Sequence, residues 1–270
     1  MKLGIVISSQ PSSFSALPFT EGIAENVAKV KKLGYDGVEL AVRNPEQLNM
    51  EMLISLLEEH QISVPAIGTG QVFLEEGLSF VDPNPDIRRK AIDRIKSHVR
   101  LAKVVDALVI IGLVRGKISK GTSQEQANEW LSEALRECAG EDTSVKLVIE
   151  PINRYETQYL TLLQDCKEIL EEADRPNTGI LADFFHLSIE EANIPESVRN
   201  VKGLIQHVHL GDSNRLLPGY GHTDWDACFR ALKDAEFNGF MNLECAIIGD
   251  PEEELPKAAD YLHKIINRIS

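Results

Sequence analysis

Several features are scarce in this chain of 270 residues, and each scarcity excludes a class of protein. Four cysteines are scattered without the paired spacing of a zinc site or a disulfide framework, which indicates free thiols in a reducing compartment. No apolar run is long enough to cross a bilayer, so no membrane partner is expected. The N-terminus reads MKLGIVISSQ, in which the apolar run is too short for a secretory signal, and we therefore expect a cytoplasmic protein.

Positive charge is also scarce. The chain has 28 lysine and arginine residues against 42 aspartate and glutamate residues, and its formal net charge is -14. A surface this acidic repels phosphate backbones, so no nucleic-acid partner is expected. The same surface gives little help in steering anionic substrates, which favours a neutral small molecule as the partner.

Short apolar runs alternate with longer amphipathic segments along the whole chain. Eight runs are predicted to be strands, over residues 3–7, 37–42, 63–68, 107–112, 146–152, 179–185, 205–211 and 240–246. Helical patterns cover residues 20–33, 45–60, 87–105, 123–138, 162–173, 224–235 and 252–269, with a shorter turn near 189–198. Continuous apolar strands are typical of a parallel sheet covered on both faces. Eight such units predict one (β/α)8 TIM barrel domain over residues 1–270; a doubly wound open sheet is the alternative.

Four consecutive predicted strands carry an ionisable residue near the rim where such a barrel gathers its chemistry, namely Glu150, Asp183, His209 and Glu244. Taken singly, His209 is as well explained as a hydrogen-bonded core residue, and each carboxylate as a salt-bridge partner. Taken together, three carboxylates without a neighbouring lysine or arginine would repel one another unless a divalent cation neutralised them. Three oxygen ligands and one imidazole suit Mn²⁺, Mg²⁺ or Co²⁺ better than structural zinc, and we expect Mn²⁺ first.

Four other residues near these strands have less direct interpretations. His207 shares a face with His209 one layer deeper in the barrel, and we interpret it as packing and support for the ligand. Strand alternation turns Cys245 away from the site. Arg115 and Lys117 follow the fourth strand and favour an anionic substrate tail, whereas the acidic loop after the eighth strand argues against a phosphorylated one.

Longer motifs in the C-terminal half carry a family resemblance. They read EPINRYE (150–156), LADFFHLSIEE (181–191), HVHLGDSNRLLPGYG (207–221) and NLECA (242–246). With them the chain resembles the xylose-isomerase-like TIM barrel superfamily, and within it the D-tagatose/D-psicose (allulose) 3-epimerase type. The N-terminal half is similar more loosely, through LGYDGVEL (33–40) and GLSFVDPNPDIRRKAI (77–92). Residues 8–19 have no counterpart, so the resemblance does not name the preferred sugar.

The resemblance implies roles for individual residues. Glu150, Asp183, His209 and Glu244 correspond to the metal ligands, and Glu150 and Glu244 also form the catalytic acid/base pair. Such a pair would move a proton on and off a ketose carbon through a cis-enediolate, with a divalent metal stabilising the charge on oxygen. The implied partner is a small, neutral sugar, and a homo-oligomer is left open.

Three more residues correspond to substrate-binding positions, namely Glu156, His186 and Arg215. From the residues alone, His186 is equally well a loop histidine that caps the next helix, and Arg215 a solvated loop cation.

Two other functions remain as alternatives. An endonuclease IV-like AP endonuclease shares this barrel, but it uses more metals and more histidine ligands, whereas His60 and His98 lie in helical patterns here. A non-catalytic sugar-binding barrel would not need two proton-transfer groups, which Glu150 and Glu244 provide.

Overall fold

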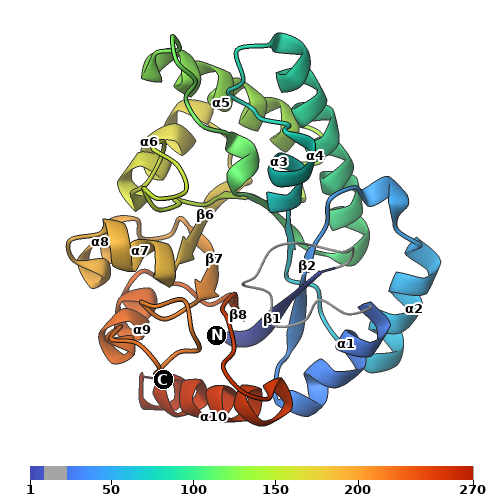
Figure 1. Cartoon of the computed structure of the whole chain (residues 1–270), viewed down its shortest axis with the longest axis vertical. Helices are drawn as coiled ribbons and strands as arrows, with labels where there is room; N and C mark the ends of the chain where they lie inside the picture. Colours follow the sequence, from blue (N-terminus) through green and yellow to red (C-terminus); the bar gives the residue numbers. More distant parts are fainter. Residues whose placement is uncertain (9–22, 270) are drawn as a thin grey trace.

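The computed structural model describes residues 1–8 and 23–269, and it contains a closed barrel of eight parallel strands (Figure 1). The strands are β1 (Lys2–Ser8), β2 (Gly37–Ala41), β3 (Ala66–Gly68), β4 (Leu108–Ile111), β5 (Leu147–Ile149), β6 (Thr178–Asp183), β7 (Ile205–Leu210) and β8 (Phe240–Leu243). Each strand bonds to the next, and β8 closes onto β1. The predicted (β/α)8 TIM barrel is confirmed, while most of the unmatched segment 8–19 lies outside the described residues.

Helices surround the strands in an outer ring (Figure 1). They are α1 (Ile23–Val30), α2 (Met50–His60), α3 (Gly70–Glu76), α4 (Pro85–Val105), α5 (Gln124–Ala139), α6 (Leu163–Ala173), α7 (Phe184–Glu190), α8 (Ile194–Asn200), α9 (Trp225–Asp234) and α10 (Pro251–Ile269). Local sequence explains where α2, α5 and α9 begin, because Asn49, Ser123 and Asp224 accept hydrogen bonds from backbone N–H groups of the first turn. No helix in the described residues has both the length and the apolar character that a membrane crossing requires.

The structure departs from the sequence prediction at short helices. The helix α3 has seven residues, too few for a helical period to stand out, and it is not predicted. The helix α7 begins inside the predicted strand 179–185, because the Asp183 side chain accepts a hydrogen bond from the Phe185 N–H (2.9 Å) and ends the strand. The predicted turn near 189–198 is the helix α8, which begins at Ile194 after the cap Asn193.

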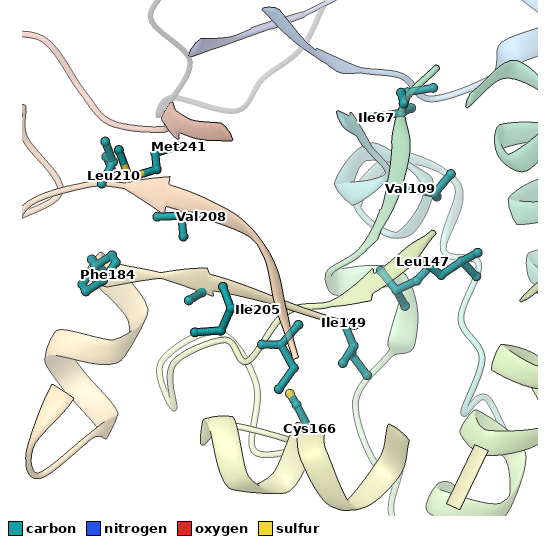
Figure 2. Packing of buried hydrophobic residues seen from close by; sticks show 14 of the residues in the cluster. Ile67, Val109, Leu147, Ile149, Cys166, Phe184, Ile205, Val208, Leu210 and Met241 are labelled. Atoms are coloured by element: carbon teal, nitrogen blue, oxygen red, sulfur yellow. The ribbon is translucent and has the colours of Figure 1, made fainter. Parts of the chain in front are cut away.

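Strand alternation separates two buried layers. Outward-facing residues such as Ile67, Val109 and Val208 belong to the large core cluster, which also includes buried residues of the helices (Figure 2). Inside the barrel, β3 to β6 contribute a separate small apolar cluster of Ala66, Ile110, Val148 and Leu181. The buried residues at the corresponding positions of β2, β7 and β8 are polar, namely Glu39, His207, His209 and Asn242. The barrel interior is therefore half apolar and half polar.

Candidate active site

The four predicted ligands meet at one end of the barrel. Two-residue periodicity turns Asp183 and His209 inward on β6 and β7, and Glu150 and Glu244 follow directly after β5 and β8. One donor atom from each of the four lies within 4.8 Å of the others. Cys245 is buried in the outer core cluster instead, as alternation predicts.

The donor atoms surround a space suited to a cation. His209 Nδ1 lies 3.7 Å from Glu244 Oε2, 3.9 Å from Glu150 Oε1 and 4.0 Å from Asp183 Oδ2. In the described part of the chain, the buried atoms Asp183 Oδ2 and His209 Nδ1 have no hydrogen-bond partner. Buried polar atoms without partners are rare and destabilising. Three carboxylates and one imidazole could therefore hold a divalent ion that satisfies both atoms.

The pKa shifts of the clustered carboxylates also favour a cation site at this position. Burial, reinforced by the nearby Glu244 charge, raises the pKa of Asp183 to about 7. Burial also raises the pKa of Glu150 well above its ordinary value, and the charges of Glu244 and Asp183 add to this effect. A bound cation would lower both pKa values, because it competes with protons for these carboxylates.

Proton competition should therefore make cation binding depend on pH. Because the pKa of Asp183 is raised to about 7, a proton occupies this ligand below that pH and must leave before a cation binds. We expect the Kd for Mn²⁺ to rise at least about tenfold per pH unit as the pH falls below 7, because Glu150, whose pKa is also raised, binds protons as well. Isothermal titration calorimetry over this range measures the effect; a Kd that does not change with pH would contradict it.

The predicted substrate-binding residues lie beside this cluster. Arg215 donates from Nη1 to Glu156 Oε1 (3.1 Å) and from Nη2 to Glu244 Oε2 (3.2 Å), and its guanidinium lies 4.7 Å from the centre of the Phe185 ring. Arg215 is therefore not a solvated loop cation. It connects Glu156 to one of the four clustered residues.

His186 is buried in the first turn of α7, and its ring edge faces the cluster. Its Nε2 atom lies 3.6 Å from Asp183 Oδ2 and 3.8 Å from Glu150 Oε1. The Asn153 side-chain amide donates to His186 Nδ1 (2.7 Å), which places the ring proton on Nε2, toward the site. Burial holds the pKa of His186 well below its usual value, so the ring is a neutral donor. The helix cap is Asp183, so the alternative of a capping loop histidine is wrong.

The position of Arg115 contradicts its interpretation as a contact for an anionic substrate tail. The side chain is wholly buried and donates to the carbonyl oxygens of Gly112, Glu150, Tyr159 and Leu160. The guanidinium is thus used inside the protein and is not available for an anionic substrate tail. By bonding to the Glu150 carbonyl (2.8 Å), it fixes the end of β5 from which that carboxylate projects.

Gly112, next to the end of β4, provides room for the Glu150 carboxylate. A Cβ atom added at Gly112 would lie 2.7 Å from Glu150 Oε2, so the variant Gly112→Ala must displace this carboxylate. If Glu150 has the acid/base role that the resemblance implies, we expect kcat to fall by about 10²-fold, since small misplacements of a catalytic group have effects of this size. Gly70→Ala is the matched control, because Gly70 lines the same pocket and an added Cβ meets no described atom within 4 Å. Equal kcat values for the two variants would contradict the expectation.

Two functional candidates escape the sequence analysis. Glu39 on β2 lies within hydrogen-bond distance of His207 and His209; its signal is a lone charge in the apolar run GVELAV. Asp212 is fully buried at the start of the loop between β7 and α9, and it accepts hydrogen bonds from four groups. The donors are the backbone N–H groups of Ser213, Gly219 and Thr223 and the indole of Trp225. Asp212 thereby organises the loop that carries Arg215.

An open pocket adjoins the cluster. Its lining includes Gln71 and Leu74 from α3 and Ile152 from the loop after β5. The described residues that line it include one arginine, Arg215, and no lysine. A small molecule without a phosphate group suits this lining best.

Fold and site together define a (β/α)8 barrel whose rim holds a carboxylate–histidine cluster that could hold a divalent cation. The chain belongs to the xylose isomerase-like TIM barrel family, whose model matches residues 27–265.

Three related proteins are informative. The chain is 26% identical over 232 residues to a ketose 3-epimerase of Arthrobacter globiformis, covering 81% of this chain and 76% of that protein. It is 26% identical over 240 residues to a 3-dehydro-D-guloside 4-epimerase of Escherichia coli (strain K12), covering 84% and 88%. A crystal structure of D-psicose 3-epimerase with D-tagatose from Clostridium cellulolyticum H10 has a TM-score of 0.83 and 22% identity, and it covers 98% of this chain and 99% of that one. The prediction of an isomerase-class enzyme is confirmed.

The endonuclease alternative requires additional histidine ligands, and the structure does not place His60 or His98 near the site. In the described residues, the rim cluster contains one histidine, His209. His60 ends α2, and His98 is buried in α4, where its ring nitrogens contact the carbonyl oxygens of Val42 and Arg94.

Proposed function

We propose that this protein is a metal-dependent sugar epimerase or isomerase that acts on a neutral ketose. The observation that carries the proposal is the convergence of Glu150 and Glu244 at one cluster, from strands separated by β6 and β7. Two carboxylates that approach one substrate from different strands can remove a proton on one face and return it on the other. Such an arrangement fits inversion at a carbon next to a carbonyl.

Each step follows from the positions of these side chains. One glutamate accepts the proton from carbon, which leaves a cis-enediolate with negative charge on oxygen. The other glutamate, which carries a proton when the sugar binds, donates it to the opposite face of the same carbon and completes the epimerisation. Proton exchange with solvent then returns the pair to its starting state. When bound to Glu150, Asp183, His209 and Glu244, a divalent cation supplies the positive charge that stabilises the developing oxyanion. We propose Mn²⁺ for this position, with Mg²⁺ or Co²⁺ as alternatives, because the donors are mainly oxygen atoms.

Three neighbouring side chains would hold the sugar. His186 presents its Nε2–H and Arg215 its guanidinium to substrate oxygens, while Glu156 can accept from a hydroxyl group. Arg215 also contacts Glu244, so it would couple the position of the substrate to that of a proton-transfer group. Neutral hydroxyl groups match this mixture of donors and acceptors better than a phosphate does.

The relatives support a ketose or a keto-glycoside as the substrate, and their names include both 3-epimerases and a 4-epimerase. The test is therefore a panel of both kinds of sugar in deuterated water, with metal-free protein and added Mn²⁺. We expect deuterium at one carbon next to the carbonyl and formation of its epimer, both dependent on the cation. If no sugar on a broad panel exchanges, the proposal is overturned.

The two alternatives predict other outcomes. Cleavage of abasic DNA at physiological salt would support the endonuclease, and tight sugar binding without exchange would support a non-catalytic barrel. The cytoplasmic location and a homo-oligomer stay predictions.

A further inference from the structure

Beneath the four clustered residues, the polar half of the barrel interior is organised by one carboxylate. Glu39 is 2% exposed and comes from β2, on the far side of the barrel from β5 and β6. Its Oε2 atom lies 2.9 Å from His207 Nε2 and 3.0 Å from His209 Nε2, and it accepts a hydrogen bond from Asn242 Nδ2 (3.0 Å). Its ion-pair partners in the described residues are the two histidines.

The contact with Glu39 determines which nitrogen of His209 faces the site. An imidazole that binds a cation is neutral and carries one N–H; because a carboxylate can only accept, that proton belongs on Nε2, which also lies 3.1 Å from Glu39 Oε1. Nδ1 is then a lone-pair donor, and it points at Glu150, Asp183 and Glu244 from 3.7 to 4.0 Å. A histidine with the opposite tautomer would present a proton to the space where a cation is expected.

We propose that Glu39 is a positioning residue that fixes the tautomer and ring orientation of His209 so that Nδ1 can serve as a metal ligand. This inference rests on the proposed metal-dependent function. Partners of this kind raise metal affinity because they hold the ligand ready in its binding form. His207 and Asn242 satisfy the rest of the carboxylate, which allows a charged group to remain at this depth.

The test compares Glu39→Gln with His207→Gln in calorimetric titrations with Mn²⁺. A glutamine at position 39 keeps the shape but is neutral, and its amide can donate to His209 Nε2 and stabilise the wrong tautomer. We expect Glu39→Gln to weaken Mn²⁺ binding by about 10- to 100-fold. The comparison variant His207→Gln also removes one partner of Glu39, but it leaves the contact with His209, so we expect it to weaken Mn²⁺ binding clearly less than Glu39→Gln does.

A second readout does not depend on the variants. Long-range ¹H–¹⁵N spectra of the wild-type protein loaded with Mg²⁺ should show the single proton of His209 on Nε2. A proton on Nδ1 in the loaded protein would overturn the inference even if Glu39→Gln failed to fold. Wild-type affinity in Glu39→Gln, or two cations bound per chain with the second lost in this variant, would also overturn it. A wild-type protein that binds no divalent cation would overturn the proposed function as well.

Discussion

Replacing either Glu150 or Glu244 by glutamine is expected to abolish epimer interconversion while leaving proton exchange on one face of the sugar. Each glutamate serves one face, so the remaining one can still remove and return a proton on its own side. We expect the interconversion rate to fall by about 10³-fold or more, the size typical of a lost general base or acid. Glutamine keeps a carbonyl oxygen for the cation but cannot transfer a proton at neutral pH. Because each variant also loses a charged ligand, the rates are compared at saturating Mn²⁺.

Deuterium incorporation into the two epimers, followed separately by NMR, provides the measurement. With Glu150→Gln, one epimer should exchange without inversion, and with Glu244→Gln the other should. Glu156→Gln is the matched control, since it makes the same chemical change in the same pocket outside the proton-transfer pair. It should slow both epimers without this asymmetry. Identical behaviour of the Glu150 and Glu244 variants toward both epimers would contradict two-base chemistry.

Asp183→Asn is expected to make the metal-free protein more stable and the cation unable to stabilise it. Burial and the Glu244 charge raise the pKa of Asp183 to about 7, so the ionised side chain destabilises the folded state increasingly as pH rises from about 4 to about 7. Asparagine removes the charge and keeps an oxygen for the Phe185 N–H cap. Above pH 7 we expect a gain of about 2 kcal/mol in the free energy of unfolding. We expect the affinity for Mn²⁺ to fall by about 10²-fold or more, since a charged ligand is lost.

Asp212→Asn is the matched control, because both aspartates are fully buried but only one has all its partners. Although burial raises the pKa of Asp212, hydrogen bonds from Trp225 and from the Ser213 and Thr223 N–H groups hold it at about 2. The amide cannot accept all four donors, so we expect this variant to lose about 1–3 kcal/mol of stability. Thermal unfolding with and without Mn²⁺ measures both changes. If the two substitutions shift the melting temperature in the same direction, the account of Asp183 is wrong.

The sequence allowed prediction of the features that depend on local periodicity. Alternation along β6 and β7 places Asp183 and His209 on the inner face, and the repeated strand–helix pattern places them at the same rim. Glu39 could not be assigned in this way, because its role depends on the distance across a closed barrel to His207 and His209. The same holds for Arg115, whose charge is visible in the sequence, whereas its carbonyl partners at Tyr159 and Leu160 become neighbours only in the folded chain.

The clustered residues and part of the pocket lining come from different strands, which has a consequence for how the proposed enzyme would acquire new substrates. The four clustered residues lie on or directly after β5 to β8, whereas Gly68, at the end of β3, Thr69 and the α3 residues Gly70, Gln71 and Leu74 line another part of the pocket. Under the proposed function, libraries confined to residues 69–76 would alter which molecule is accepted without touching the proton-transfer pair. Glu39 also lines the pocket, but its contacts with His207 and His209 connect it to the proposed metal site, so a wider library should leave it unchanged.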